Sequence, residues 1–412
     1  MSSPAICDVI ILTLDTPDVT ERCIASIFKH TPQPGRLIIV NNGGGTNIQM
    51  LLESLNPPDH IEKIILSYDH NIGFVRGNNE ALKHTRAPYL CLLNSDTLVT
   101  HGWLSEMLQC MDQDAQIGLL NPTGNHTGYP KPSSQSVDDW ATIRYQRYQG
   151  KTKRVTKVSG FCLLMRRDTY VDTQGFDEDI DRAFFEDEDL SLRAKQAGWA
   201  CAQSLGACIY HQEHASFAKL DFDPQVIFKK NRRWFLNKWG ESRRIAVCLR
   251  YDKSDPATTH AEFSFLLKPL CDASHQVTIF TNHRPIYRRK KKDSVLFPET
   301  ESSATSLQCG LVLFYVRLFL MLLVKKKKMH FLVSNSFLFL NICRFLRVAR
   351  KLRLIALCKT VQDITQLTHA FSPHDVDWVV LAPQIASTPL PSEWQAKQIH
   401  ASDYLMLRKI SD

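Results

Sequence analysis

The sequence predicts an α/β protein of two units, each with a mostly parallel sheet between layers of helices. Short β-branched, apolar runs alternate with longer mixed segments along the chain. Several of these runs are apolar on both faces, which is typical of strands that helices cover on both sides of a sheet. The alternation pauses near residue 240 and then restarts, and 412 residues exceed one ordinary domain. We therefore expect one domain over residues 1–240 and a second over residues 241–412.

In the first unit, the elements follow from the apolar pattern. Strands are expected at residues 7–14, 37–40, 61–66, 89–93 and 158–166. Helices are expected at residues 19–28, 48–55, 78–84 and 190–197. Residues 121–157 are rich in Pro, Gly, Ser, Asn and Lys, so we expect a long irregular loop there, a feature that is more often functional than structural.

In the second unit, the same alternation predicts further strands and a helix. The strands are expected at residues 244–249, 276–281, 329–333, 352–357 and 376–381, and the helix at 261–270. The apolar stretch 307–324 has about the minimum length of a membrane span, but Arg317 near its middle disfavours one. A buried helix, or a helix on an anionic surface beside the basic runs 288–292 and 325–328, is favoured, and those runs can also be solvated loops.

Composition and charge exclude several classes of protein. Hydrophobic residues make up 44% and charged residues 22%, which argues against a disordered, collagenous or coiled-coil chain. The 12 cysteines show no C-x-x-C pair, so a zinc finger is disfavoured and a reduced cytoplasmic protein is expected. The N-terminus lacks the basic region of a signal peptide. Residues 1–240 hold 25 Lys+Arg and 28 Asp+Glu, whereas the remainder holds 25 and 14, so the two units should have different partners.

Polar residues follow the strand predicted at 89–93. Asn94, Ser95 and Asp96 stand where open α/β sheets bind ligands, at the carboxyl end of a strand. A carboxylate there can hold a divalent cation that bridges two phosphates. A simple turn is the alternative, because all three residue types favour turns.

A dense acidic segment precedes the helix predicted at 190–197. Residues 177–189 contain eight carboxylates, more than a helix N-terminus needs, although acidic residues do stabilise such an end. Crowded like charges raise pKa values, and a raised pKa makes a carboxylate a usable general base. Phe184 and Phe185 could exclude water from one side of this cluster.

Two further segments are candidates for ligand contact. His211 follows a predicted strand end and could be either a structural residue or a metal or phosphate ligand. Residues 71–79 place two glycines and three asparagines between a strand and a helix, which lets the backbone approach a ligand closely.

Five segments of residues 6–240, taken in order, resemble the family 2 inverting glycosyltransferases, which have a GT-A fold. Residues 9–15 are similar to the first nucleotide-binding strand, and the next segment, at 37–44, reads LIIVNNGG. The third, at 71–79, reads NIGFVRGNN, and the fourth, at 92–97, reads LLNSDT, a variant of the D-x-D motif. The fifth, at 159–199, includes GFDE and FFEDEDLSLR and is the most similar. The subgroup that the chain most resembles includes rhamnosyltransferase-like enzymes of cell-surface polysaccharide assembly.

The resemblance implies roles for particular residues. Asp187 would be the catalytic base, and Asp96 and His211 would hold Mg²⁺ or Mn²⁺. Glu186, Glu188 and Asp189 would position the acceptor or tune the base, and the aromatic residues of 121–157 would contact the acceptor. The candidates for binding the nucleotide sugar are Thr13, Asp15, Asn41, Gly73, Asn79 and Asn94. Asn41 and Asn94 stand where the family usually has Asp, which leaves the base preference open and removes one charge from the metal site.

These features predict a metal-assisted glycosyltransferase that moves a sugar from a nucleotide-diphosphate donor to a glycan or lipid-linked acceptor. The expected location is the cytoplasm, with possible contact of the basic second half with a membrane face. Residues 241–412 resemble an incomplete half of a GT-B glycosyltransferase, which implies a Rossmann-like accessory domain. The alternative is a catalytically silent relative that binds a nucleotide sugar or a partner. A nucleic-acid-binding protein is disfavoured, since no such motif occurs and the first unit is slightly acidic.

Overall fold

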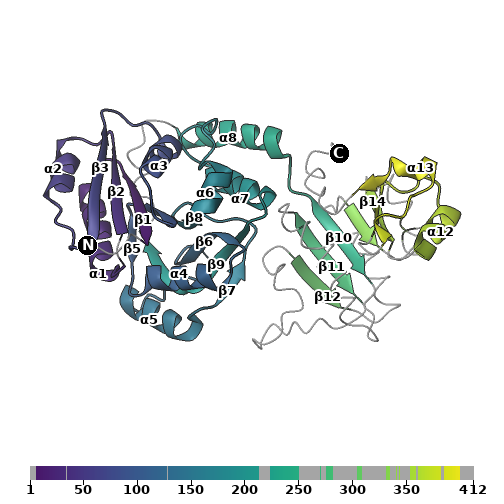
Figure 1. Ribbon diagram of the computed structural model, residues 1–412, viewed down its shortest axis with the longest axis horizontal. Coiled ribbons are helices and arrows are strands. Elements are labelled where there is room, and N and C mark those ends of the chain that lie inside the picture. Colours follow the sequence, from purple (N-terminus) through teal and green to yellow (C-terminus); the bar gives the residue numbers. More distant parts are fainter. Residues whose placement is uncertain are drawn as a thin grey trace. The chain divides into compact units, whose positions relative to one another are not determined.

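The chain forms two compact units, Met1–Lys238 and Trp239–Asp412, in this computed structural model (Figure 1). The structure describes residues 6–33, 35–127, 129–212, 223–249, 270, 275–281, 304–308, 331–334, 340, 343, 353–358, 361–381 and 385–399. The predicted helix at 261–270 lies outside the described residues except for Leu270. The basic runs and most of the apolar stretch at 307–324 lie outside them as well.

The first unit is built on a nine-stranded sheet with helices on both faces. Its strands are β1 (Cys7–Thr13), β2 (Gly35–Asn42), β3 (Ile61–Tyr68), β4 (Tyr89–Asn94), β5 (Thr97–Val99), β6 (Ile117–Gly124), β7 (Thr152–Arg154), β8 (Cys162–Arg166) and β9 (Ala200–His211). Its helices are α1 (Pro17–His30), α2 (Thr46–Ser54), α3 (Phe74–Lys83), α4 (Trp103–Gln113), α5 (Val137–Tyr148), α6 (Arg167–Thr173), α7 (Glu186–Gln196) and α8 (Pro224–Trp239).

The sheet changes from parallel to mixed halfway across. Its strand order is β3-β2-β1-β4-β8-β6-β9-β5, and β7 pairs with β9. Strands β3, β2, β1 and β4 run parallel, whereas β8 pairs antiparallel with both β4 and β6. The expected α/β fold with a mixed sheet between helices is confirmed for this unit.

Alternation of side chains along the central strands divides the core into two layers. Val9 and Ile11 of β1 pack in a cluster with residues of α1, α2 and α4. Ile10 points to the other face and packs in a cluster with residues of α3 and α7. All three side chains are buried, as expected for a strand that helices cover on both sides.

The prediction of a long irregular loop at residues 121–157 is wrong. The segment contains the end of β6, helix α5 and strand β7. Ser136 caps α5 by accepting a hydrogen bond from the backbone N–H of Asp139 at 3.0 Å. Only Trp140 and Ala141 of α5 are buried, so the helix lacks the regular apolar stripe by which a sequence pattern reveals a helix.

Among its described residues, the second unit contains a seven-stranded sheet in which all the pairings are parallel. Its strands are β10 (Arg244–Leu249), β11 (Gln276–Thr281), β12 (Ala304–Gln308), β13 (Phe331–Ser334), β14 (Arg353–Cys358), β15 (Trp378–Leu381) and β16 (Gln398–Ile399). Helices α12 (Val361–Ala370) and α13 (Ser392–Gln395) are also described. The order β12-β11-β10-β13-β14-β15-β16 is typical of doubly wound sheets. The likeness to half of a GT-B glycosyltransferase stays a prediction.

Candidate functional site

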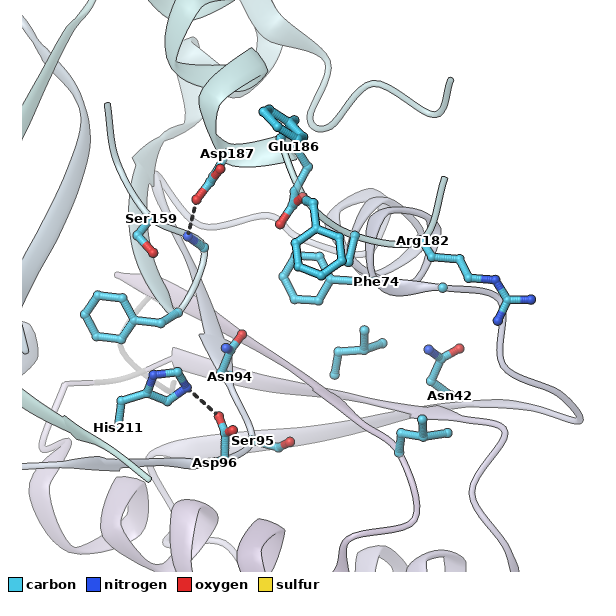
Figure 2. Close-up of a pocket in the computed structure, with 18 of the residues that line it drawn as sticks. Asn42, Phe74, Asn94, Ser95, Asp96, Ser159, Arg182, Glu186, Asp187 and His211 are labelled. Atoms are coloured by element: carbon cyan, nitrogen blue, oxygen red, sulfur yellow. Dashed lines mark hydrogen bonds and ion pairs between the residues drawn. The ribbon is translucent and has the colours of Figure 1, made fainter. Parts of the chain in front are cut away.

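A cavity of about 710 Å³ opens in the first unit at the carboxyl ends of β1 and β4. Its walls come from segments that are far apart in the sequence, namely the strand ends, the start of α3, the turn before α7 and the exposed face of α8. Figure 2 shows Asp96 and His211 on one side of this cavity and Glu186 and Asp187 on the opposite side.

The pairing of β5 with β9 brings Asp96 and His211 together. Thr97 lies opposite His211 in this antiparallel pair, which places the ring next to the residue before Thr97. Nε2 of His211 lies 2.9 Å from Oδ1 of Asp96, and the Asp96 side chain is buried. Nδ1 of His211 is buried and has no hydrogen-bond partner. One imidazole and one carboxylate therefore share the edge of the cavity.

The opposite wall is formed by the turn that leads into α7. The backbone angle φ is 57° at Arg182, 73° at Phe184 and 73° at Phe185. This is the left-handed conformation, which residues other than glycine rarely adopt. Such backbone strain clusters at functional sites, where the surrounding structure holds it in place. The turn directs the first residues of α7 toward the cavity.

Asp187 lies on this wall with a raised pKa. Its Oδ1 accepts a hydrogen bond from the backbone N–H of Glu188 at 2.7 Å, and its Oδ2 lies 3.4 Å from the backbone N of Gly160. Burial raises the pKa of Asp187, and the charge of Lys157 partly opposes that rise. A carboxylate in such a setting suits general-base catalysis.

Glu186 and Glu188 flank Asp187 and line the same cavity. Burial and the neighbouring Asp187 charge raise the pKa of Glu186 to about 8. The Oε2 atom of Glu186 is buried without a hydrogen-bond partner. Glu188 instead pairs with Lys157, with 2.8 Å between Oε2 and Nζ.

Three of the six residues expected to bind the nucleotide sugar line the cavity, namely Thr13, Gly73 and Asn94. Asp15 and Asn41 are not among the lining residues. Asn41 donates to Oε1 of Gln49 at 2.9 Å and accepts from the backbone N–H of Gly44 at 2.9 Å, so its amide shapes the turn after β2.

Asn79 and Asp189 have structural partners, which corrects their expected roles. The Asn79 amide is buried, donates to the carbonyl of Phe176 at 2.9 Å and accepts from the N–H of Phe176 at 2.9 Å. Asp189 is 0% exposed and pairs with Arg193 at 2.6 Å and with Lys238 at 2.7 Å. Neither side chain lines the cavity, because both are used to join neighbouring segments of the unit.

The aromatic residues expected to contact the acceptor also lie elsewhere. Trp140 is a buried residue of α5, and neither Tyr145 nor Tyr148 of the same helix lines the cavity. The aromatic side chains that do line it are Phe74, Phe161, Phe184, Phe185 and Phe228. Phe228 comes from α8, which the sequence pattern did not mark.

His126 is a lining residue that the sequence reasoning missed. Its ring centroid lies 4.5 Å from that of Phe161 and 4.9 Å from that of His211. Gly124 leaves room for this stack, since a Cβ there would lie 3.2 Å from the His126 ring. Asn42 and Asn71 were missed as individual residues, although they belong to segments that the sequence marked. Strand-end position is the signal that could have found Asn42.

Asp96 and His211 are suited to bind a metal ion whose remaining ligands come from the substrate. Mg²⁺ is usually bound by one or two carboxylates together with substrate phosphates, and imidazole also suits Mn²⁺. Across the described parts of the chain, no group of three or more His, Cys, Asp or Glu side chains is placed to hold an ion. Oxygen atoms of a bound diphosphate would therefore have to complete the coordination.

No helix within the described ranges is both long and apolar enough to cross a membrane.

Comparison with known proteins relates part of the chain to one family. Residues 8–172 match the family described as glycosyl transferase family 2. The O-antigen biosynthesis protein RfbC of Myxococcus xanthus is 25% identical over 219 residues, which cover 49% of this chain and 17% of that protein. The poly-beta-1,6-N-acetyl-D-glucosamine synthase of Staphylococcus aureus (strain MSSA476) is 23% identical over 172 residues, or 40% of each chain. The matched segments thus span less than half of either relative.

Two solved structures align with part of the chain. TarS residues 1–349 of S. aureus in complex with UDP-GlcNAc superpose with a TM-score of 0.43 at 14% identity, over 63% of this chain and 73% of that one. The mannosyltransferase PcManGT of Pyrobaculum calidifontis, in complex with GDP-Man and Mn²⁺, gives a TM-score of 0.40 at 11% identity, over 58% and 74%.

The first unit is thus an α/β domain, and residues 8–172 of it match a glycosyl transferase family. This match covers less than half of the 412 residues, and the class that it indicates is that of the family 2 glycosyl transferases. The expected resemblance to that family is confirmed.

Proposed function

We propose that the first unit transfers a sugar from a nucleotide-diphosphate donor to a hydroxyl group of a cell-surface glycan or lipid-linked acceptor, with inversion at the anomeric carbon. One observation carries this proposal: Asp187 lines the same 710 Å³ cavity as the Asp96–His211 pair, on the opposite wall. The polysaccharide-related names of the two relatives support the class of acceptor.

Asp187 is the proposed catalytic base. It accepts the proton of the acceptor hydroxyl while the oxygen of that hydroxyl forms a bond to the anomeric carbon. The bond between that carbon and the diphosphate oxygen breaks on the opposite face, which inverts the configuration and releases a nucleoside diphosphate. The raised pKa of Asp187 makes it a better proton acceptor than an ordinary aspartate.

Asp96 and His211 are the proposed ligands of Mg²⁺ or Mn²⁺. When bound, the ion supplies positive charge that stabilises the departing diphosphate. Thr13, Gly73 and Asn94, which share the cavity edge with Asp96, are proposed to contact the donor. Asp15 and Asn41 lie near Gly44 and are proposed to act only by shaping the loop around the nucleotide.

The second unit is proposed to be an accessory domain that helps the enzyme to reach its acceptor at the cytoplasmic face of a membrane. The excess of basic over acidic residues in 241–412 supports it, because anionic lipids attract such a domain. No contact with nucleic acid is proposed.

A panel of donors tests the proposal. UDP-, dTDP- and GDP-sugars are added to the full chain with and without Mn²⁺ or Mg²⁺, and thermal stability and released nucleoside diphosphate are measured. Metal-dependent stabilisation by one donor, followed by release of its nucleoside diphosphate with an envelope extract, is the expected result. Stabilisation without release under any condition supports the silent relative instead.

A further inference from the structure

We propose that Phe184, Phe228 and Glu186 form a subsite that binds the sugar ring carrying the acceptor hydroxyl. The inference rests on the proposed function, since it gives a place to the acceptor of that reaction. It replaces Trp140, Tyr145 and Tyr148, which do not line the cavity, with a set of residues that does.

The aromatic part of this subsite is held in a fixed arrangement. The ring centroids of Phe184 and Phe228 lie 5.7 Å apart with the planes at 77°, and those of Phe185 and Phe228 lie 5.2 Å apart. Phe185 in turn packs against Phe235, which is buried in the unit. The left-handed backbone of Phe184 and Phe185 persists because this packing holds it.

Phe228 itself is 44% exposed although it is a large apolar side chain on the cavity wall. Aromatic faces carry partial negative charge and attract the weakly positive C–H groups of a sugar ring. An edge-to-face pair at the mouth of a cavity therefore suits a pyranose ring that enters from solvent.

Glu186 supplies the polar contact of the subsite. The residue is 9% exposed, and its side chain points toward the cavity (Figure 2). Its Oε2 atom has no partner, and a buried polar atom without one is unfavourable until a ligand satisfies it. Gly160 leaves the space beside it open, since a Cβ there would lie 3.9 Å from Oε1 of Glu186.

The protonation of Glu186 complements that of Asp187. The charged groups that face it are Asp187 and Lys157, and the raised pKa of Glu186 keeps its proton in place near neutral pH. A protonated carboxyl donates a hydrogen bond, whereas ionised Asp187 accepts one. The two neighbouring residues can thus hold one acceptor by two different contacts, with the reacting hydroxyl on Asp187.

The position of the subsite favours the acceptor over the donor. Glu186 is adjacent to the proposed base, whereas Asp96 and His211, the proposed diphosphate end, lie on the opposite wall. A ring that stacks on Phe184 and Phe228 therefore lies on the side from which the attacking oxygen must come.

Four variants of the full chain test the subsite, namely E186A, E186Q, F228A and the control V226A. Val226 lies on α8, as Phe228 does, is 59% exposed and does not line the cavity. The acceptor probes are octyl glycosides of glucose, galactose, N-acetylglucosamine and rhamnose, and KM is measured separately for donor and acceptor.

We expect E186A and F228A to raise the acceptor KM by about tenfold or more, with the donor KM unchanged, which corresponds to the loss of one good contact. E186Q should stay within about threefold of wild type, because its amide still donates a hydrogen bond. V226A should match wild type.

Two results would overturn the subsite. If E186Q raises the acceptor KM as much as E186A does, Glu186 acts as an anion. If neither E186A nor F228A changes the acceptor KM, the sugar ring does not bind at this subsite. A wild-type protein that neither binds nor consumes any nucleotide sugar contradicts the proposed function itself, which separates the two failures.

Discussion

Nε2 of His211 lies 2.9 Å from Oδ1 of Asp96, although 115 residues separate them in the sequence. Antiparallel pairing of β5 with β9 creates this contact, because it sets Thr97 opposite His211. The pair is therefore a product of the mixed half of the sheet, and it faces the acidic first turn of α7 across one cavity.

Removal of the metal should stop transfer. EDTA is expected to abolish release of nucleoside diphosphate, and added Mn²⁺ or Mg²⁺ to restore it. D96N should lower the rate at least about 100-fold, since it removes the carboxylate that the diphosphate site depends on. Asp59 is exposed and remote from the cavity lining, so D59N is the matched control. Full activity of the D96N protein in EDTA would show that transfer does not require a metal ion.

Replacement of Asp189 should damage stability rather than chemistry. D189A leaves Arg193 and Lys238 without their buried partner, and breaking such a pair costs about 3–5 kcal/mol. Denaturant unfolding measures the loss, and D179A, which changes an exposed aspartate, should cost less than about 0.5 kcal/mol. The structural role fails if D189A unfolds like wild type yet loses transfer.

The stability of the protein should respond to pH through Glu186. Its pKa is about 8 in the folded protein and near the ordinary 4.5 when unfolded, so the unfolded state loses the proton first as pH rises. The contribution of Glu186 to folding is present below pH about 4.5 and is lost as pH rises through about 8.

E186Q removes this titration. Its Tm should equal that of wild type at pH 4.5 and exceed it by a few degrees at pH 8.5. The difference between the two melting temperatures, followed by differential scanning calorimetry across this range, is the measurement. A constant difference at every pH would show that Glu186 ionises normally.

The rate of transfer should depend on the ionisation of Asp187. A base must be ionised to accept a proton, so kcat should fall as pH decreases through the raised pKa of Asp187. The acidic limb of the profile should thus lie above the range of an ordinary aspartate, near 3.9. Steady-state rates between pH 4.5 and 8 locate this limb, and D59N should show the same limb as wild type. A flat profile over this range argues for a different base.

The strands of the first unit could be predicted because their apolar runs reflect burial on both faces. The site motifs were also visible, since strand ends and glycine-rich turns have marked composition. Helix α5 was missed because its residues are mainly polar and Trp140 is its main buried anchor. Asn79 and Asp189 were misassigned because sequence spacing does not tell whether a polar side chain is directed at a ligand or at a neighbouring segment.

His126 and Phe228 could not be predicted for a related reason. His126 lies in a polar segment next to Gly124, and only the fold brings its ring to His211. Phe228 reaches the cavity because α8 packs beside the turn at Phe184 and Phe185. Contacts between distant segments are set by tertiary packing, which local composition does not record.

The proposed transfer depends most on Asp187 as the base. The direct measurement is single-turnover transfer by D187N, with donor affinity determined on the same protein by calorimetry. Loss of a base typically lowers the rate about 10²- to 10⁴-fold, and we expect that loss with donor affinity within about threefold of wild type. Wild-type turnover by D187N would contradict the account.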